Sequence, residues 1–154
     1  MMKKIFVICT LLLLFTGCAK EEAGSTSCTM YNKDVVNGYE LSSTYVINHK
    51  NGLVESVETV ETVSSEDEEI LDTMETYLND TYKALDESYG GYTYEVKNEN
   101  GKVTSRVKID YNKMDIDSYV TDQPTIKDYV EDSKLTLEGV KLMYESMGAT
   151  CEEK

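Results

Sequence analysis

Apolar and polar residues alternate along two neighbouring stretches in the first half of the chain. In residues 39–47 most apolar side chains fall at odd positions, and this period of two predicts a β-strand. An Asn-Gly dipeptide separates this strand from the Val- and Thr-rich stretch 53–63, and together they predict a β-hairpin. Because the valines of the second stretch recur every three residues, we expect a β-bulge there or a position at a sheet edge.

A long helix is predicted directly after this hairpin. Ser65 and Glu68 have the spacing of a capping box, and the acidic run around them suits the positive end of a helix dipole. Apolar residues then recur at intervals of three and four until Gly90-Gly91 ends the pattern. The predicted apolar stripe consists of Ile70, Leu71, Met74, Tyr77, Leu78, Tyr82 and Leu85.

A second hairpin is predicted near the middle of the chain. Apolar and polar residues alternate in 92–96 and again in 103–109, on either side of a turn at 98–101. Residues 111–117 break the alternation, which predicts a loop or a single helical turn.

The last part of the chain predicts two short helices and a strand. Pro124 suits an early helical position in an amphipathic segment that reaches Val130. Thr136 suits the N-cap of a last helix, and Gly148 suits its end. Residues 149–152 are long enough for a terminal strand.

These elements predict an α+β fold. We expect an antiparallel sheet built from hairpins, with one long and one or two shorter helices packed on one face. A short strand over 28–33 would begin this fold, and residues 28–154 have the length of a single domain.

The first eighteen residues have the features of an export signal. Lys3-Lys4 precedes the apolar run Ile5–Phe15, and small residues precede Cys18. The apolar run is about half as long as the roughly 20 residues that a membrane-spanning helix needs. Residues 1–17 are therefore predicted to be a signal peptide.

The junction Phe15-Thr16-Gly17-Cys18 resembles the bacterial lipobox, with Phe15 where the lipobox usually has Leu. This resemblance implies that cleavage before Cys18 makes it the new N-terminus, with a thioether-linked diacylglycerol. The protein would then be anchored to the cell membrane, on its extracytoplasmic face, through two acyl chains. The alternative is an ordinary signal peptide whose cut site lies beside a cysteine.

The remaining cysteines follow from this export hypothesis. Residues 18–27 are expected to be the lipidated cysteine and a flexible linker, because they are small, polar and without periodicity. Cys28 and Cys151 are then predicted to form a disulfide, since disulfides persist outside the reducing cytosol. A terminal strand beside the strand 28–33 would bring the two cysteines together. Two thiols without further ligands fall short of a metal site.

The charge of the chain is strongly acidic. The first 17 residues hold two lysines and no acidic residue, so the other 137 residues carry 13 basic and 29 acidic residues, a net charge of −16. Such a surface repels nucleic acid and anionic lipid head groups. We therefore expect no nucleic-acid partner, and expect the lipid on Cys18 to supply membrane attachment.

Several stretches resemble the YehR-like family of small bacterial lipoproteins. They are Thr44-Tyr45-Val46 with the following turn and the stretch 54–59, the stretch 103–117, and the ending from Leu135 to Gly148. The likeness covers most of residues 39–150 and implies a compact α+β domain on a lipid anchor, with no established biochemical activity. The pair of Cys28 and Cys151 is not part of this family pattern.

The sequence contains no motif for catalysis, a cofactor or a metal. His49, the one histidine, is expected in the hairpin turn, in contact with solvent. Asp110, Asp115 and Asp117 lack the spacing of a calcium loop, so a solvated acidic loop is expected. No cofactor and no metal are expected.

Three tyrosines are candidates for a ligand-binding rim. Tyr89, Tyr92 and Tyr94 flank Gly90-Gly91, where exposed aromatic rings beside a flexible glycine pair would suit binding. Core packing is the alternative interpretation for these rings.

The leading functional hypothesis is a binding or accessory module at the cell envelope, without enzymatic activity. Its partner would be an unknown envelope protein or a small ligand. The second hypothesis is a structural or assembly partner of a membrane complex, and an envelope enzyme using carboxylates is a distant third. A concave apolar pocket would favour a small ligand, whereas an exposed apolar or tyrosine patch would favour a protein partner.

Overall fold

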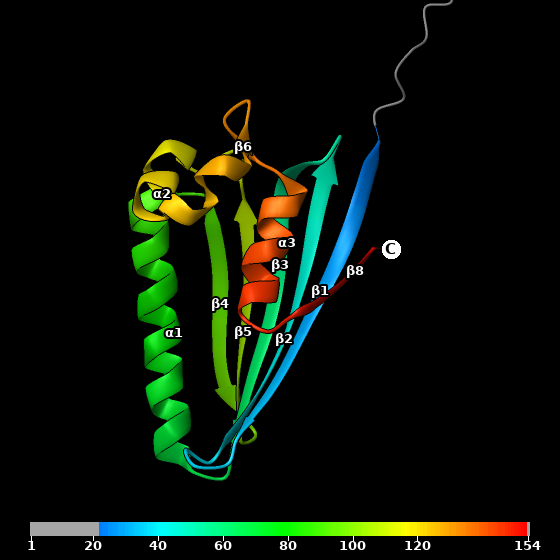
Figure 1. Cartoon of the computed structure of the whole chain (residues 1–154). Coiled ribbons are helices and arrows are strands. Elements are labelled where there is room, and N and C mark those ends of the chain that lie inside the picture. The colour runs from blue at the N-terminus through cyan, green and yellow to red at the C-terminus, as the bar shows by residue number, and fades with distance from the viewer. Residues whose placement is uncertain (1–21, 154) are drawn as a thin grey trace, which may run out of the picture.

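The computed structural model describes residues 22–153 and shows one six-stranded antiparallel sheet (Figure 1). Helices pack on one face of this sheet, so the predicted α+β class is confirmed. Across the sheet the strands lie in the order β4 (Tyr92–Glu99), β5 (Lys102–Asp110), β3 (Leu53–Ser65), β2 (Tyr39–Lys50), β1 (Ala23–Asp34) and β8 (Thr150–Glu153).

The longest helix follows β3 in the chain, and the other helices follow β5. A small two-stranded ribbon, β6 (Val130–Glu131) with β7 (Lys134–Leu135), connects the last two of them. Among residues 22–153, no helix is both long and apolar enough to span a membrane. The helices are α1 (Glu68–Tyr89), α2 (Ile116–Asp122), the 3-10 helix η1 (Pro124–Tyr129) and α3 (Leu137–Ser146).

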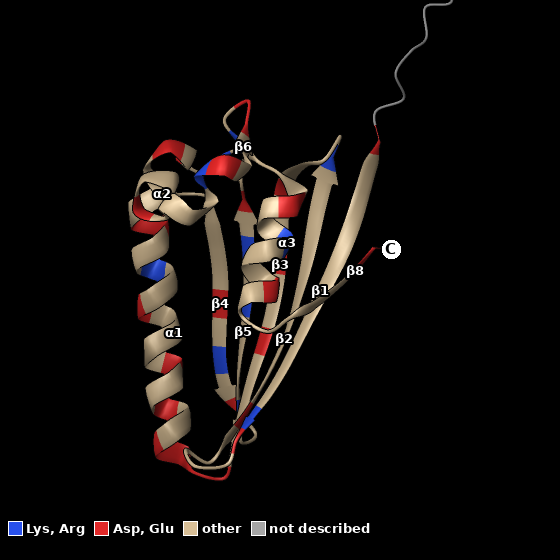
Figure 2. Cartoon of the chain, in the orientation of Figure 1, with Lys and Arg blue, Asp and Glu red and all other residues tan. Residues whose placement is uncertain are grey.

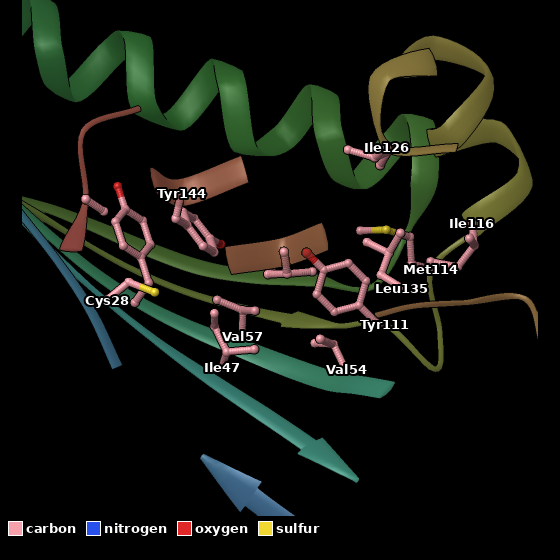
Figure 3. Close-up of a cluster of buried hydrophobic side chains, with 13 residues drawn as sticks. Cys28, Ile47, Val54, Val57, Tyr111, Met114, Ile116, Ile126, Leu135 and Tyr144 are labelled. Atoms are coloured by element: carbon pink, nitrogen blue, oxygen red, sulfur yellow. The ribbon is translucent and has the colours of Figure 1, made fainter. Parts of the chain in front are cut away.

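The core lies between the helices and one face of the sheet, which we name the inner face. Its larger cluster of buried side chains joins β1, β2 and β3 to α2, η1 and α3 (Figure 3). In this cluster the ring of Tyr45 stacks on the ring of Tyr144, with 4.1 Å between centroids. The smaller cluster joins Val63 and Val103 of the sheet to Leu71 of α1.

The predicted irregularity in β3 is a β-bulge. The register with β2 shifts between Asn48 and His49, because β3 contains one additional residue there. Val57 and Val63 are buried on the inner face, whereas Val60 lies on the opposite face and is 37% exposed. The alternative of an edge position is wrong, because β3 is paired on both sides.

Helix α1 begins two residues later than the predicted capping box implies. Asp67 is the N-cap and accepts a hydrogen bond from the Glu69 amide at 2.9 Å. The hydroxyl of Ser65 instead accepts from the Asp67 amide. Tyr77, predicted on the apolar stripe, is 62% exposed, because the sheet contacts a narrower face of the helix. Gly90 ends α1 with a φ of 69°, as predicted.

The last helices lie close to their predicted positions. Thr136 caps α3 by accepting from the Gly139 amide at 3.2 Å, which confirms that prediction. Pro124 opens a helix, but this helix is of the 3-10 type. In the predicted loop 111–117, Asp115 caps the short helix α2 through the Ser118 amide.

The predicted linker extends too far along the chain. Strand β1 begins at Ala23, so residues 23–27 form part of the sheet, and Thr26 is fully buried. The physical reason is that β2 continues to Lys50 and offers backbone partners to every residue of β1. Cys18 and the predicted signal peptide, residues 1–17, lie outside the described residues.

Strand β8 forms where the sequence predicts the terminal strand. Within the described part of the chain it pairs only with β1, over four residue pairs, and one of these pairs is Cys28 with Cys151. Their sulfur atoms lie at disulfide distance, 2.00 Å apart. The geometry is thus the one that the predicted disulfide requires.

Candidate binding surface at the turn between β1 and β2

The three tyrosines of the predicted rim make different contacts. Tyr89 donates a hydrogen bond to Asp122 at 2.8 Å, which raises the pKa of its hydroxyl. Tyr92 lies on the inner face against the larger core cluster, where burial raises its pKa. Tyr94 faces the ring of Tyr82 instead, with 5.7 Å between centroids. Tyr89 and Tyr92 therefore adjoin one core cluster, and Tyr94 is directed toward α1.

The acidic loop also has local roles. Asp110 forms an ion pair with Lys113 at 3.1 Å, and this bond lowers the pKa of the Asp110 carboxyl group. The pKa of Asp115 is lowered because its carboxylate accepts hydrogen bonds from Ser118. Within residues 22–153 no group of three or more His, Cys, Asp or Glu side chains could hold a metal ion.

His49 does not lie in the hairpin turn, so that expectation is wrong. It belongs to β2, and its ring occupies the space where a side chain on Gly24 would be, 2.6 Å from the position of a Cβ there. Its Nδ1 is buried and has no hydrogen-bond partner among the described residues. His49 stays inside the sheet because it pairs with Val54 of β3 on one side and with Gly24 of β1 on the other.

The turn between β1 and β2 exposes two valines. Val35 is 78% exposed and Val36 is 94% exposed. The carboxylate of Asp34 holds the turn, since it accepts hydrogen bonds from the Val36 amide at 3.1 Å and the Asn37 amide at 2.9 Å. The Asn37 side chain also donates to it at 2.7 Å. These bonds from Asn37 and Val36 lower the pKa of Asp34.

The turn is also tied to the start of α1. Ser65 donates a hydrogen bond to the Gly38 carbonyl at 2.8 Å and accepts one from the Asp67 amide at 3.1 Å. Gly38 has a φ of 75°, a conformation that favours glycine. The exposed valines thus stand on a turn whose backbone is fixed at both ends.

Two adjoining hollows lie beside these valines. Their volumes are about 650 and 580 Å³, and both are lined by Val36, Tyr39, Asp67 and Ile70. The second hollow continues along α1 to Met74. We name the two hollows, together with the turn, the valine-tip groove.

The rim of the valine-tip groove is acidic. Asp34, Glu66, Asp67 and Glu69 line it, and Lys33 is the one basic residue there among residues 22–153. Figure 2 shows the acidic residues gathered at the start of α1 and in the loop before it. Lys33 is paired with Glu40, so it does not neutralise the other carboxylates.

Sequence reasoning did not identify the valine-tip groove. The residue pattern gave no role to Val35 and Val36. The available signal was two adjacent β-branched apolar residues at a turn, where Gly, Asn, Asp and Ser are usual.

A second feature that the sequence did not reveal is a carboxyl group on the inner face. Glu61 of β3 accepts a hydrogen bond from Tyr82 of α1 at 2.5 Å and one from Ser105 at 3.3 Å. Tyr45 and Ser43 each donate to its other oxygen at 3.5 Å. Because both oxygens are occupied by protein hydroxyls, this cluster fixes α1 to the sheet and is not an open binding site.

Comparisons with known proteins bear on the fold. No protein-family model matches the chain, and no curated protein matches it. The NMR structure of E. coli YehR is similar, with a TM-score of 0.52, 18% sequence identity, and coverage of 86% of this chain and 92% of that chain. The NMR structure of a protein from Streptococcus pneumoniae TIGR4 has a TM-score of 0.47 and 13% identity, covering 100% and 98% of the two chains. The likeness to the YehR structure shows that the chain has a YehR-like fold.

Proposed function

We propose that this chain is an exported bacterial lipoprotein that binds a protein of the cell envelope through the valine-tip groove. Its anchor is the diacylglycerol on Cys18, on the extracytoplasmic face of the cell membrane. The export pattern in residues 1–18 supports this location. The proposed activity is binding, without catalysis.

One observation carries the binding proposal, which is the exposure of Val35 and Val36 on a hydrogen-bonded turn. Fully burying a valine contributes roughly 1.5–3 kcal/mol, so leaving two of them in water forgoes stabilisation that a bound partner would provide. The half-buried side chains of Tyr39, Ile70 and Met74 extend this apolar surface along the groove. Contiguous exposed apolar surface of this kind marks interaction sites.

The position of the groove agrees with a membrane anchor at the N-terminus. Strand β1 begins at Ala23, at the opposite end of the sheet from the turn (Figure 1). Its 12 residues separate the two ends by about 40 Å. A domain tethered through Cys18 would therefore present the valine-tip groove away from the bilayer.

An assembly role within a membrane complex is the second candidate. It uses the same groove, and it differs in that the captured partner would be a stable subunit of a complex. We do not propose an enzyme, because the carboxylate of Glu61 on the inner face already accepts hydrogen bonds from four hydroxyl groups.

Replacing Cys18 tests the anchor. In cells that express the Cys18→Ala protein, we expect it to leave the membrane fraction, because the change removes the thiol that would carry the two acyl chains. Fractionation followed by mass measurement of the N-terminal peptide provides the readout. Retention of the variant in the membrane would overturn the lipid anchor.

Site-specific crosslinking tests the groove. A photo-crosslinking residue at position 36 should capture one envelope protein in intact cells, whereas the same residue at position 142 should not. Leu142 is a matched control, since it is an exposed apolar residue (41%) on α3, remote from the turn. Capture should also disappear when Val35 is replaced by Ser. Equal capture from both positions would contradict the proposal.

A further inference from the structure

We infer that the valine-tip groove takes a polypeptide segment in which one or two apolar side chains are flanked by Lys or Arg. This inference rests on the proposed function, because it names the chemistry of the partner at the same groove. It follows from the charge of the rim, from the size of the two hollows, and from the poor fit of other occupants.

The charge of the rim selects a basic partner. Glu66 and Glu69 stand on the loop and first turn of α1, and both side chains are exposed. No ion pair to either carboxylate is found among residues 22–153. Asp34 and Asp67 are already engaged by amides of the turn and of α1. The carboxylates of Glu66 and Glu69 therefore lie exposed beside the apolar surface. Lys or Arg side chains of a partner would pair with them.

The size of the groove suits side chains of a short segment. Hollows of about 650 and 580 Å³ lie within the range of pockets that hold small ligands or a few side chains. Val36 and Ile70 line both hollows, so each hollow could take one apolar side chain of the segment. Burying one such side chain together with the valines would remove apolar surface from water on both partners.

Other occupants fit the groove less well. A second copy of the chain would bring two acidic rims together, and like charges across an interface are unfavourable. An anionic bilayer surface would be repelled for the same reason. A divalent cation is disfavoured because no set of three metal-ligating side chains is assembled among residues 22–153.

Peptide binding to the whole exported protein, purified from membranes in a zwitterionic detergent, tests the inference. The probe is an acetylated and amidated hexapeptide of sequence Lys-Lys-Leu-Leu-Lys-Lys. Two comparison peptides replace either the lysines by Glu or the leucines by Ser. We expect the first peptide alone to bind, with NMR shifts at Val36, Tyr39 and Ile70, and its affinity should fall as salt is raised.

Variants separate the contributions of charge and apolar surface. The pair Glu66→Gln and Glu69→Gln should weaken binding by about three- to tenfold, as expected for two exposed charge pairs. The matched pair Glu138→Gln and Glu145→Gln on α3 should leave it unchanged. Val36→Ser should also weaken binding, and folding should be unaffected because Val36 is almost fully exposed.

The inference is overturned if the Glu peptide binds as well as the Lys peptide, or if the α1 and α3 variants behave alike. It is also overturned if the shifts lie away from the groove, or if the peptide does not bind. Failure of these tests with successful crosslinking at position 36 would leave the proposed function standing with a partner of different chemistry. Failure of the crosslinking would remove the proposed function itself.

Discussion

At the scale of single residues, a few hydrogen bonds decide how α1 meets the sheet. The carboxyl group of Glu61 faces the helices between the two core clusters, where an unsatisfied polar group would be costly. The Tyr82 hydroxyl reaches it from α1, and burial, followed by the Glu61 charge, raises the pKa of Tyr82 well above its ordinary value of 10.0. Tyr82 thus positions the helix through a polar hydroxyl group, although it belongs to the apolar stripe of α1.

Removing the Tyr82 hydroxyl should destabilise the protein. The change Tyr82→Phe deletes the 2.5 Å bond to Glu61 and should lower the free energy of unfolding by about 1–3 kcal/mol. Tyr77→Phe is the matched control on the same helix, and its effect should stay within about 0.5 kcal/mol because Tyr77 is exposed. Urea unfolding of both variants provides the measurement. Equal stabilities of the two variants would show that the bond has no net effect.

At the scale of elements, strand β8 depends on a single neighbour. It pairs with β1 over four residue pairs and lies at the sheet edge. The predicted bond between Cys28 and Cys151 would join this last strand to the first one, across 123 residues of chain. A short edge strand of this kind would otherwise open more readily than the central strands.

The intact mass of the exported protein should increase by two hydrogens on reduction if Cys28 and Cys151 form the disulfide. Loss of the bond should lower the free energy of unfolding by up to about 4–5 kcal/mol in the chain-entropy model. The variant Cys151→Ala should also lose amide-exchange protection in Thr150–Glu153, while β2 and β3 retain theirs. Two free thiols in the native exported protein would contradict the prediction.

At the scale of the whole molecule, buried tyrosines recur throughout the core. Burial is the largest cause that raises the pKa of the hydroxyl groups of Tyr45, Tyr82, Tyr92, Tyr111, Tyr119 and Tyr144. Most of them belong to the larger cluster, and Tyr82 connects α1 to the sheet. Their titration therefore couples to global unfolding.

The protein should lose stability as the pH rises above about 10. In the unfolded chain these hydroxyls release protons near their ordinary value of 10.0, whereas the folded protein retains them. The folded state then binds more protons than the unfolded state, so the stabilisation is complete below pH 10 and decreases above it. Tyrosinate absorbance should rise together with the loss of sheet circular dichroism. Complete ionisation with the sheet intact would contradict this expectation.

The sequence by itself determined the elements and their order. Alternation in 39–47 and 103–109, the helical spacing after Glu68, and the cap at Thr136 are local patterns, and local geometry is sufficient to interpret them. The same patterns predicted a terminal strand at Cys151, and the structure shows that this strand pairs with β1 at Cys28.

Only the tertiary structure decided which surfaces are covered. Residues 23–27 form strand because β2 lies beside them, and Tyr77 is exposed because the sheet contacts a narrow face of α1. The valine-tip groove exists because Ser65 fixes the turn against the start of α1, a contact between residues 27 positions apart. Burial depends on such distant partners, whereas periodicity depends on neighbours in the chain, and this difference separates what the sequence determined from what the fold decided.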